Sequence, residues 1–299
     1  MLKQKQYLQS VNLKSGTDFP YLVLDVVDDR AYPRNPGFQV MHWHRDLQFL
    51  YLLAGNVEVR TLDRTLPVRA GEAVFINQEV VHNIRRLGNC HYNSFIFPAS
   101  FLTFYPGSPA KAFVDDVTAS GQLSLLHFSP DIGWQQEAIR QLQHLSQLEQ
   151  EKTALYPYEV LTTLCTLWLT VRRHITPSQS GKKESALSQR VQKILQFIEQ
   201  HYAEELTLFD LANSAHISKS ECARCFRQGL GCTPFQYLME YRLSRAAQLL
   251  QETDRPVGEV ALAAGFHQMS YFGRCFREKT GLSPREYRRA NRTSDKEER

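Results

Sequence analysis

An internal repeat between residues 206 and 289 constrains the fold of this chain more than any other feature. A shift of fifty residues places the run RCFR at 224–227 on the run RCFR at 274–277. The same shift places Gly231 on Gly281. Self-similarity at a fixed offset is typical of a duplicated structural unit. The C-terminal part of the chain is therefore expected to contain two copies of one small fold.

Each copy predicts a short helix, a tight turn and a second helix. In the first copy, Leu208 and Leu211 lie at helical spacing, and Ser218 follows as an N-cap whose hydroxyl can accept from a free backbone N–H. The second copy begins at Pro256, which suits a first helical position, and turns through Gly265, which can adopt a positive φ. The turn of the second copy needs one extra residue. This pattern is the helix-turn-helix, whose second helix can lie in the major groove of DNA.

The segment between the two copies predicts one continuous helix. It reads TPFQYLMEYRLSRAAQLLQET, with apolar residues near a helical period and no internal glycine. A helix of about seventeen residues is roughly 25 Å long. Such a spacer would hold two recognition helices near the ~34 Å repeat of B-DNA. The expected partner is double-stranded DNA, read at tandem sites in adjacent major grooves on one face.

Residues 190–289 resemble the DNA-binding domain of the AraC/XylS family of bacterial transcription regulators. The motifs that carry the resemblance are RLSRAAQLL in the connecting helix, VALAAGF in the second copy, and the closing YFGRCFREKTGLSPREYRR. The resemblance implies a regulator that binds tandem sites near promoters, commonly as an activator. An activator would also have RNA polymerase as a partner.

The exposed face of each predicted recognition helix supplies the candidates for reading bases. Arg224 suits guanine, Glu221 suits the amino group of cytosine and Gln268 suits adenine. The full predicted set is Lys219, Ser220, Glu221, Arg224, His267, Gln268, Met269, Ser270 and Arg274. Any one of them can instead be solvated or contact a phosphate. Arg227, Arg277 and Lys279 are expected to bind phosphates or form helix salt bridges, which position a protein without specifying sequence.

The charge distribution agrees with a DNA-binding C-terminal part. Residues 1–180 contain 16 Lys+Arg and 16 Asp+Glu, whereas residues 181–299 contain 19 and 15. The whole formal excess of +4 therefore lies where a polyanion would bind. No apolar run approaches the length of a membrane span, and no basic leader precedes an apolar segment. The expectation is a cytoplasmic protein with no membrane partner.

Residues 1–100 predict β-structure. Alternating segments such as FQVMHWH, QFLYLLAG, VEVRTL and EAVFIN are separated by Gly, Asn and Pro at short intervals, which favours a sandwich or small barrel. The segment resembles a cupin, the jelly-roll domain that often forms the sensor half of AraC-type regulators. The expected fold is therefore multidomain: an all-β cupin or jelly-roll barrel with appended helices, then an all-α domain with two helix-turn-helix motifs joined by a linker helix.

A group of polar residues in the predicted barrel is the candidate ligand site. If residues 38–44 form a strand, His42 and His44 point to the same face. Gln48, Asn77 and His82 complete the group. The cupin pattern implies that two histidines, a glutamate and a third histidine can hold a metal, but this chain has Gln48 in place of the glutamate and Asn77 in place of the usual proline. Contact with a small molecule is favoured; structural hydrogen bonding, and a transition metal at the three histidines, remain open. No cofactor is assigned.

From residue 101 to residue 175 the period becomes helical. Trp134, Ile139 and Leu142 lie at helical spacing, as do Leu164 and Trp168. These helices either cap the barrel or form a self-pairing surface, and a homodimer through residues 134–175 is favoured. The predicted divisions are 1–100 sensor barrel, 101–175 helical dimerisation segment, 176–186 linker, 187–290 DNA-binding domain and 291–299 tail.

The combined prediction is a transcription regulator that responds to a small-molecule effector. A sugar is the preferred effector because it is the commonest theme of the family that the chain resembles. Two alternatives remain. One is a constitutive DNA-binding protein whose barrel serves only as a dimerisation scaffold, and the other is a metal-dependent cupin enzyme fused to a DNA-binding domain. No second carboxylate or nucleophile supports catalysis, so the chain is not expected to be an enzyme.

Overall fold

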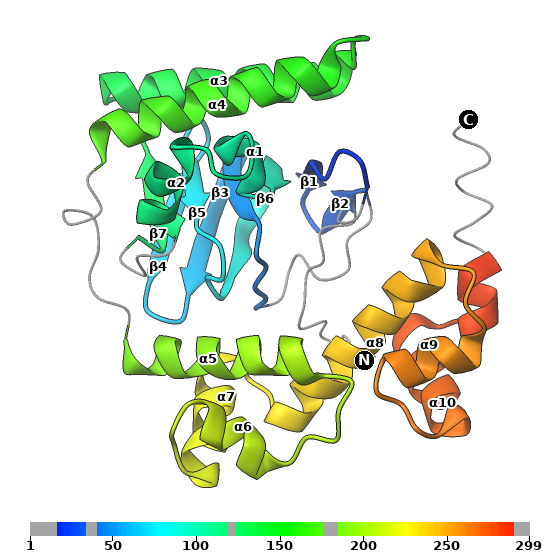
Figure 1. The fold of residues 1–299 in the computed structure, drawn as a ribbon. Coiled ribbons are helices and arrows are strands. Elements are labelled where there is room, and N and C mark those ends of the chain that lie inside the picture. The colour runs from blue at the N-terminus through cyan, green and yellow to red at the C-terminus, as the bar shows by residue number, and fades with distance from the viewer. Residues whose placement is uncertain (1–16, 34–40, 119–122, 176–184, 290–299) are drawn as a thin grey trace. The chain divides into compact units, whose positions relative to one another are not determined.

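The computed structural model describes residues 17–33, 41–118, 123–175 and 185–289 of the 299-residue chain. These residues fall into two compact units, one inside Ser10–Ser188 and one inside Gln189–Arg299. The first combines a sheet with helices and the second is helical (Figure 1). None of the described helices is both long and apolar enough to cross a membrane.

Among the described residues, seven antiparallel strands form the sheet of the first unit. They are β1 (Leu22–Val27), β2 (Arg30–Tyr32), β3 (Leu47–Thr61), β4 (Thr65–Arg69), β5 (Ala73–Ile76), β6 (His82–Phe97) and β7 (Leu125–Phe128). Their order is β2-β1-β6-β3-β5-β7, and β4 pairs with β3. The two long strands β3 and β6 pair with each other, with register shifts between Leu52 and Ala54 and between Gly55 and Val57. Such irregularities bend a strand pair and increase its twist.

Both faces of this sheet are buried, because successive side chains of a strand point to opposite faces. Phe49 and Tyr51 pack in one hydrophobic cluster, while Leu50 and Leu52 pack in another. The first cluster is shared with helices α1 (Ser100–Thr103), α2 (Ala110–Thr118), α3 (Gly133–Glu151) and α4 (Tyr156–His174). Figure 1 shows α3 and α4 running together along one side of the sheet. Burying a side chain such as Phe49 contributes about 1.5 to 3 kcal/mol.

The predicted change from strands to helices is confirmed, with two corrections. Strand β7 lies inside the segment 101–175 that was predicted to be helical. The expected strand through His42 and His44 is also wrong for its described part, because residues 41–44 form only an isolated bridge between His42 and His82. The other residues of that expected strand, 38–40, lie outside the described residues.

The second unit consists of helices, and side chains cap the first turns of several of them. They are α5 (Ala186–His201), α6 (Leu208–Ser214), α7 (Lys219–Gly229), α8 (Pro234–Glu252), α9 (Val257–Ala263) and α10 (Met269–Thr280), followed by a short helix over residues 284–289. Thr207 and Thr233 form capping boxes with Asp210 and Gln236. At about 1.5 Å per residue, α8 is about 28 Å long. The expected rigid spacer is therefore present between the two pairs of helices.

The predicted helix-turn-helix pairs are α6 with α7 and α9 with α10. Ser218 caps α7 by accepting from the backbone N–H of Glu221, as expected. Gly265 occupies the second turn with a φ of +79°. Pro256 is the residue before α9 rather than its first residue. The turn between α9 and α10 is one residue longer than the turn between α6 and α7, as the alignment of the two copies required.

Candidate DNA-binding surface and sensor pockets

The predicted DNA-reading residues of α7 lie on its outer surface. Lys219, Ser220 and Arg224 are exposed, and Glu221 is half-buried. The opposite side of the helix is packed, since Cys222, Cys225 and Phe226 are fully buried. Helix α7 is therefore fixed by its apolar side and presents its polar side outward, as a recognition helix must.

Two of these outward residues are bound to each other. Arg224 donates from Nε to Oε2 of Glu221 at 2.8 Å and from Nη2 to Oε1 at 2.7 Å, which makes a bidentate pair. Arg190, from α5, donates to the same Oε1 at 2.6 Å. The hydrogen bonds from Arg224 hold the pKa of the Glu221 carboxyl below its ordinary value. Glu221 therefore remains charged and neutralises part of the positive surface of α7.

Helix α10 presents a different surface. His267, Gln268, Met269 and Ser270 are all exposed at or before its first turn. The guanidinium of Arg274 lies 5.5 Å from the centre of the Tyr271 ring, a cation–π geometry. Phe272 and Phe276 are buried on the other side. The predicted set of the second copy is thus exposed, at the start of α10 and in the turn that precedes it.

The three residues predicted to contact phosphates divide into two groups. Arg227 and Arg277 are exposed in the last turns of α7 and α10. Lys279, by contrast, forms an ion pair with Glu240 of α8, and its side chain is only 9% exposed. Its position is that of a salt bridge between helices, which is the second role that the sequence allowed.

Four of the five predicted ligand-site residues come together in the sensor unit. His42, His44, Gln48 and His82 are all buried. Nε2 of His44 and Nε2 of His82 each lie 2.9 Å from the atom assigned as Oε1 of Gln48. The other terminal atom of that amide lies 2.6 Å from the hydroxyl of Ser94. The ring centroids of His42 and His82 are 4.4 Å apart.

The backbone decides how the protons are arranged in this histidine cluster. Nδ1 of His44 lies 2.9 Å from the carbonyl of Asp46, and Nδ1 of His82 lies 2.8 Å from the carbonyl of Val80. A carbonyl only accepts, so Nδ1 carries the hydrogen in both rings, and in this tautomer a neutral imidazole has its lone pair on Nε2. The two orientations of a glutamine amide have the same shape. With the NH₂ of Gln48 toward the rings, every one of these contacts has a donor and an acceptor.

The same cluster also fits a metal ion. One donor atom from each of His42, His44 and His82 lies within 4.8 Å of the others. With Oε1 of Gln48 turned toward the rings, three imidazoles and an amide oxygen converge, and the carbonyls at Nδ1 orient the rings as is usual around histidine ligands. Burial, followed by the nearby His42 and His44, lowers the pKa of His82 well below its ordinary value. His82 is therefore neutral, as either arrangement requires.

Asn77 is not part of the hydrogen-bonded cluster described above. Its amide donates to the carbonyls of Val117 and Leu123 at 2.8 and 2.9 Å, and its oxygen accepts from the backbone of Gln78. These bonds join the end of β5 to the end of α2 and to the chain just before β7. The described contacts of Asn77 are structural.

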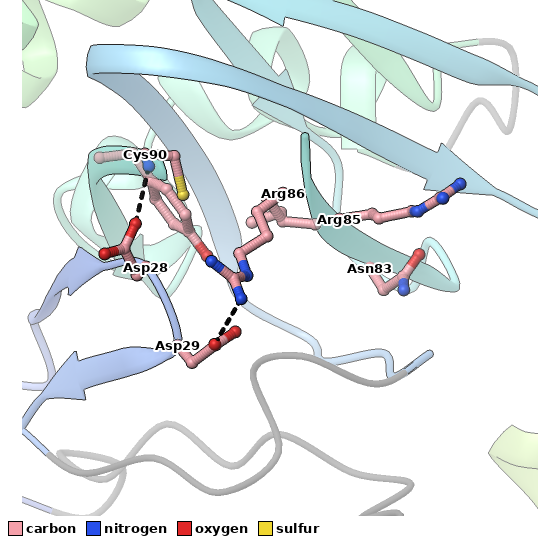
Figure 2. Close-up of a pocket in the computed structure, with 8 residues that line it drawn as sticks. Asp28, Asp29, Asn83, Arg85, Arg86 and Cys90 are labelled. Atoms are coloured by element: carbon pink, nitrogen blue, oxygen red, sulfur yellow. Dashed lines mark hydrogen bonds and ion pairs between the residues drawn. The ribbon is translucent and has the colours of Figure 1, made fainter. Parts of the chain in front are cut away.

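An open pocket that sequence reasoning missed lies near the β1–β2 turn. Its volume is about 160 Å³, and its lining residues are Asp28, Asp29, Asn83, Ile84, Arg85, Arg86, Cys90 and Tyr92. Figure 2 shows Arg86 beside Asp29, a 2.7 Å ion pair, and Asp28 bonded to the backbone N–H of Cys90. Ile84, Cys90 and Tyr92 are buried, whereas Asp29 and the arginines are exposed. The pocket thus combines an apolar floor with a charged rim.

Comparisons with known proteins match a different sequence model to each of the two units. A sequence model described as an AraC-like ligand binding domain matches residues 29–161, and one described as a helix-turn-helix domain matches residues 211–290. The uncharacterized transcriptional regulator YdeC of Bacillus subtilis is 28% identical over 291 residues, which cover 96% of this chain and 99% of YdeC.

Two further relatives match most of the chain. The transcriptional activator RhaR of Mannheimia succiniciproducens is 26% identical over 268 residues, covering 88% of this chain and 90% of RhaR. The melibiose operon regulatory protein of Escherichia coli is 24% identical over 256 residues, covering 83% of both chains. Together with the two sequence models and the paired helix-turn-helices, they show that the chain belongs to the AraC/XylS family of DNA-binding transcription regulators, with an N-terminal ligand-binding domain.

Proposed function

We propose that this regulator is an activator whose action on DNA is controlled by a small polar effector bound in the sensor unit. The observation that carries the proposal is the open pocket with a charged rim inside the region that matches a ligand-binding domain. A cavity of about 150 Å³ accepts a molecule the size of benzene. A pocket of about 160 Å³ therefore suits a single small ring or a short chain.

Two places in the sensor unit compete for this effector. The histidine cluster is the site predicted from the sequence, but its side chains are buried and already hydrogen-bonded to one another. The pocket at Asp28 and Arg86 is open, and its exposed ion pair contributes little stability, so a ligand can replace it at small cost. This contrast favours the pocket for an organic effector, with the histidine cluster as the alternative.

A sugar is the effector class that we favour. Carboxylates and guanidinium groups on one rim can accept from and donate to the same set of hydroxyls. One relative of this chain is named as a melibiose operon regulator, and another is named as an activator. An activator of this kind would act on RNA polymerase at the promoter.

We further propose that the chain forms a homodimer through residues 134–175. Tyr158 and Leu169 are 71% and 49% exposed on α4, and they are eleven residues apart, which places them on one side of a helix. Leu155, just before α4, is also exposed. Light scattering at micromolar concentration is expected to give a dimer, and Leu169→Glu is expected to weaken it. A monomeric wild-type protein would remove this part of the proposal.

The test of effector sensing is a thermal-shift panel on the full chain with sugars, sugar acids, small aromatics and divalent metals. A ligand at about a hundred times its Kd stabilises its unit by about 2.7 kcal/mol, which is enough to raise a melting midpoint by several degrees. Loss of the shift in Arg86→Ala would assign the ligand to the pocket, and loss in His82→Ala would assign it to the histidine cluster. A chelator-induced drop in melting temperature would indicate a metal at the histidines.

The ligand that passes this test must also change DNA binding or transcription, because an effector alters an equilibrium only through different affinities for two states. Fluorescence anisotropy with promoter DNA and run-off transcription measure the two outcomes. A ligand that stabilises the protein but changes neither would favour the constitutive regulator with a scaffold barrel. Turnover of that ligand would instead support the cupin enzyme.

A further inference from the structure

We propose that Glu221 is a specificity-determining residue that restrains Arg224 from binding DNA phosphates non-specifically. The sequence predicted both residues as readers of bases. The structure places them in contact with each other, through the two hydrogen bonds of 2.7 and 2.8 Å. A phosphate that approaches Arg224 therefore meets a guanidinium whose charge a carboxylate already neutralises through two of its five N–H donors.

Glu221 itself is held in place from two sides. Arg190 of α5 donates to Oε1 of Glu221 at 2.6 Å, and the backbone N–H of Glu221 is bonded to the N-cap Ser218 at 3.2 Å. Because the carboxylate is shared with a helix outside the helix-turn-helix pair, it does not move freely with Arg224. A carboxylate held by a second arginine is suited to restraining Arg224, rather than to following a cytosine into the groove.

The second copy of the repeat provides the internal comparison. The fifty-residue shift that places Arg224 on Arg274 places Glu221 on Tyr271. The two equivalent arginines therefore have different neighbours three residues earlier: a carboxylate on α7, and an aromatic ring at 5.5 Å on α10. An aromatic ring orients a guanidinium without neutralising its charge. Arg274 is thus presented to DNA as a full positive charge, and Arg224 is not.

This difference has a measurable consequence for DNA binding. Each phosphate that a protein neutralises adds about 0.9 to the slope of log Kd against log salt concentration. When a phosphate displaces the Glu221 carboxylate from Arg224, one ion pair is exchanged for another and none is gained. When Arg224 instead meets the edge of the correct base, it forms hydrogen bonds of fixed geometry that other bases cannot form. Glu221 therefore selects against non-specific binding through α7, while binding through Arg274 continues on any sequence.

The experiment is fluorescence anisotropy of the full chain with a short mixed-sequence duplex, between ~50 and ~200 mM salt. Glu221→Gln is expected to bind more tightly and to steepen the salt slope by about 0.9, so that the Kd ratio across this range rises about 3-fold. Tyr271→Glu, which gives α10 the arrangement of α7, is expected to reduce the slope by about the same amount. Arg274→Ala should also reduce the slope, whereas Arg224→Ala should leave it nearly unchanged.

Three controls make the result decisive. Glu205→Gln removes one negative charge from the exposed loop before α6 and should change the slope much less than Glu221→Gln. The double variant Glu221→Gln with Arg224→Ala should lose the tighter binding and the steeper salt slope of Glu221→Gln, because both act through Arg224. Circular dichroism and melting temperature confirm that each variant is folded. An equal effect of Glu205→Gln, or a gain that persists without Arg224, would overturn the proposal.

Discussion

Replacing Gly265 by alanine is expected to open the second helix-turn-helix locally. Gly265 has a φ of +79°, and a left-handed conformation costs a residue with a Cβ about 1 to 2 kcal/mol. The added Cβ would lie 2.7 Å from the carbonyl oxygen of Tyr202 and 2.8 Å from Nε of Arg242. Nε of Arg242 donates a 2.7 Å hydrogen bond to this carbonyl oxygen, so the added methyl group would crowd both partners of that bond.

Both consequences act on the same turn. A hydrogen bond to a charged group contributes about 1.5 to 3 kcal/mol, and its loss adds to the cost of the backbone conformation. The expected destabilisation of α9 and α10 is therefore about 2.5 to 5 kcal/mol. Since each 1.4 kcal/mol changes an opening equilibrium about tenfold, amide hydrogen exchange in these helices should accelerate by about 60-fold to several thousand-fold.

The assay is hydrogen exchange of the full chain followed by mass spectrometry of peptides from α9 and α10, because the two units need not unfold together. Gly273→Ala is the matched control in the same pair of helices. Gly273 lies inside α10, and beyond the neighbouring backbone of α10 itself no described atom lies within 4 Å of an added Cβ. Alanine there should slow exchange up to about fivefold through helix propensity. Unchanged protection in Gly265→Ala, together with the expected effect of Gly273→Ala, would refute the reasoning.

Three other predictions follow from the described contacts. The pKa of His82 is lower in the folded than in the unfolded protein, so the unfolded state binds a proton first as the pH falls from about 7 to about 5. The melting temperature of the sensor unit should therefore fall over this range, and His82→Gln should reduce the fall. A melting temperature that does not change with pH would contradict this prediction. Asn77→Ala removes the amide that donates to two buried carbonyls and should lower the sensor unit's unfolding free energy by about 1 to 3 kcal/mol in chemical denaturation, whereas no change would show that water replaces the amide. Arg274→Ala should weaken binding to the cognate site, once selected from random sequences, by about 1 to 3 kcal/mol more than it weakens binding to mixed-sequence DNA, with relaxed preference at one base pair; equal weakening on every sequence would assign Arg274 to the backbone.

The DNA-binding unit was predictable because its signals are local. A cap such as Ser218, a turn glycine such as Gly265 and the spacing of buried residues on α7 act within a few positions of one another. The pairing of Glu221 with Arg224 is also local, at a spacing of three residues. The contribution of Arg190 was not predictable, because it depends on how α5 packs against α7.

For the sensor unit, the sequence predicted the fold class but not the pocket, because the pocket depends on pairing between strands that are distant in the sequence. The pocket joins Asp28 and Asp29 to Arg86 through the alignment of β1 with β6, and no spacing in the sequence indicates that alignment. The short strand β7 was missed because a run of four residues, Leu-Leu-His-Phe, is too short to show a period. The histidines did come together, although the bridge between His42 and His82, rather than the expected strand, is the observed backbone connection.

The two copies of the repeat differ on their DNA-facing sides while sharing a packing arrangement. Phe226 meets Tyr237 edge-on with ring centroids 5.9 Å apart, and the equivalent residues Phe276 and Tyr287 meet in the same way at 5.3 Å. Such aromatic pairs contribute about 0.5 to 1.5 kcal/mol beyond the area that they bury. Their recurrence ties each recognition helix to the helix that follows it. Because the packing fixes that attachment, the outward residues can differ, so one scaffold presents an arginine paired with a carboxylate on α7 and an arginine beside an aromatic ring on α10.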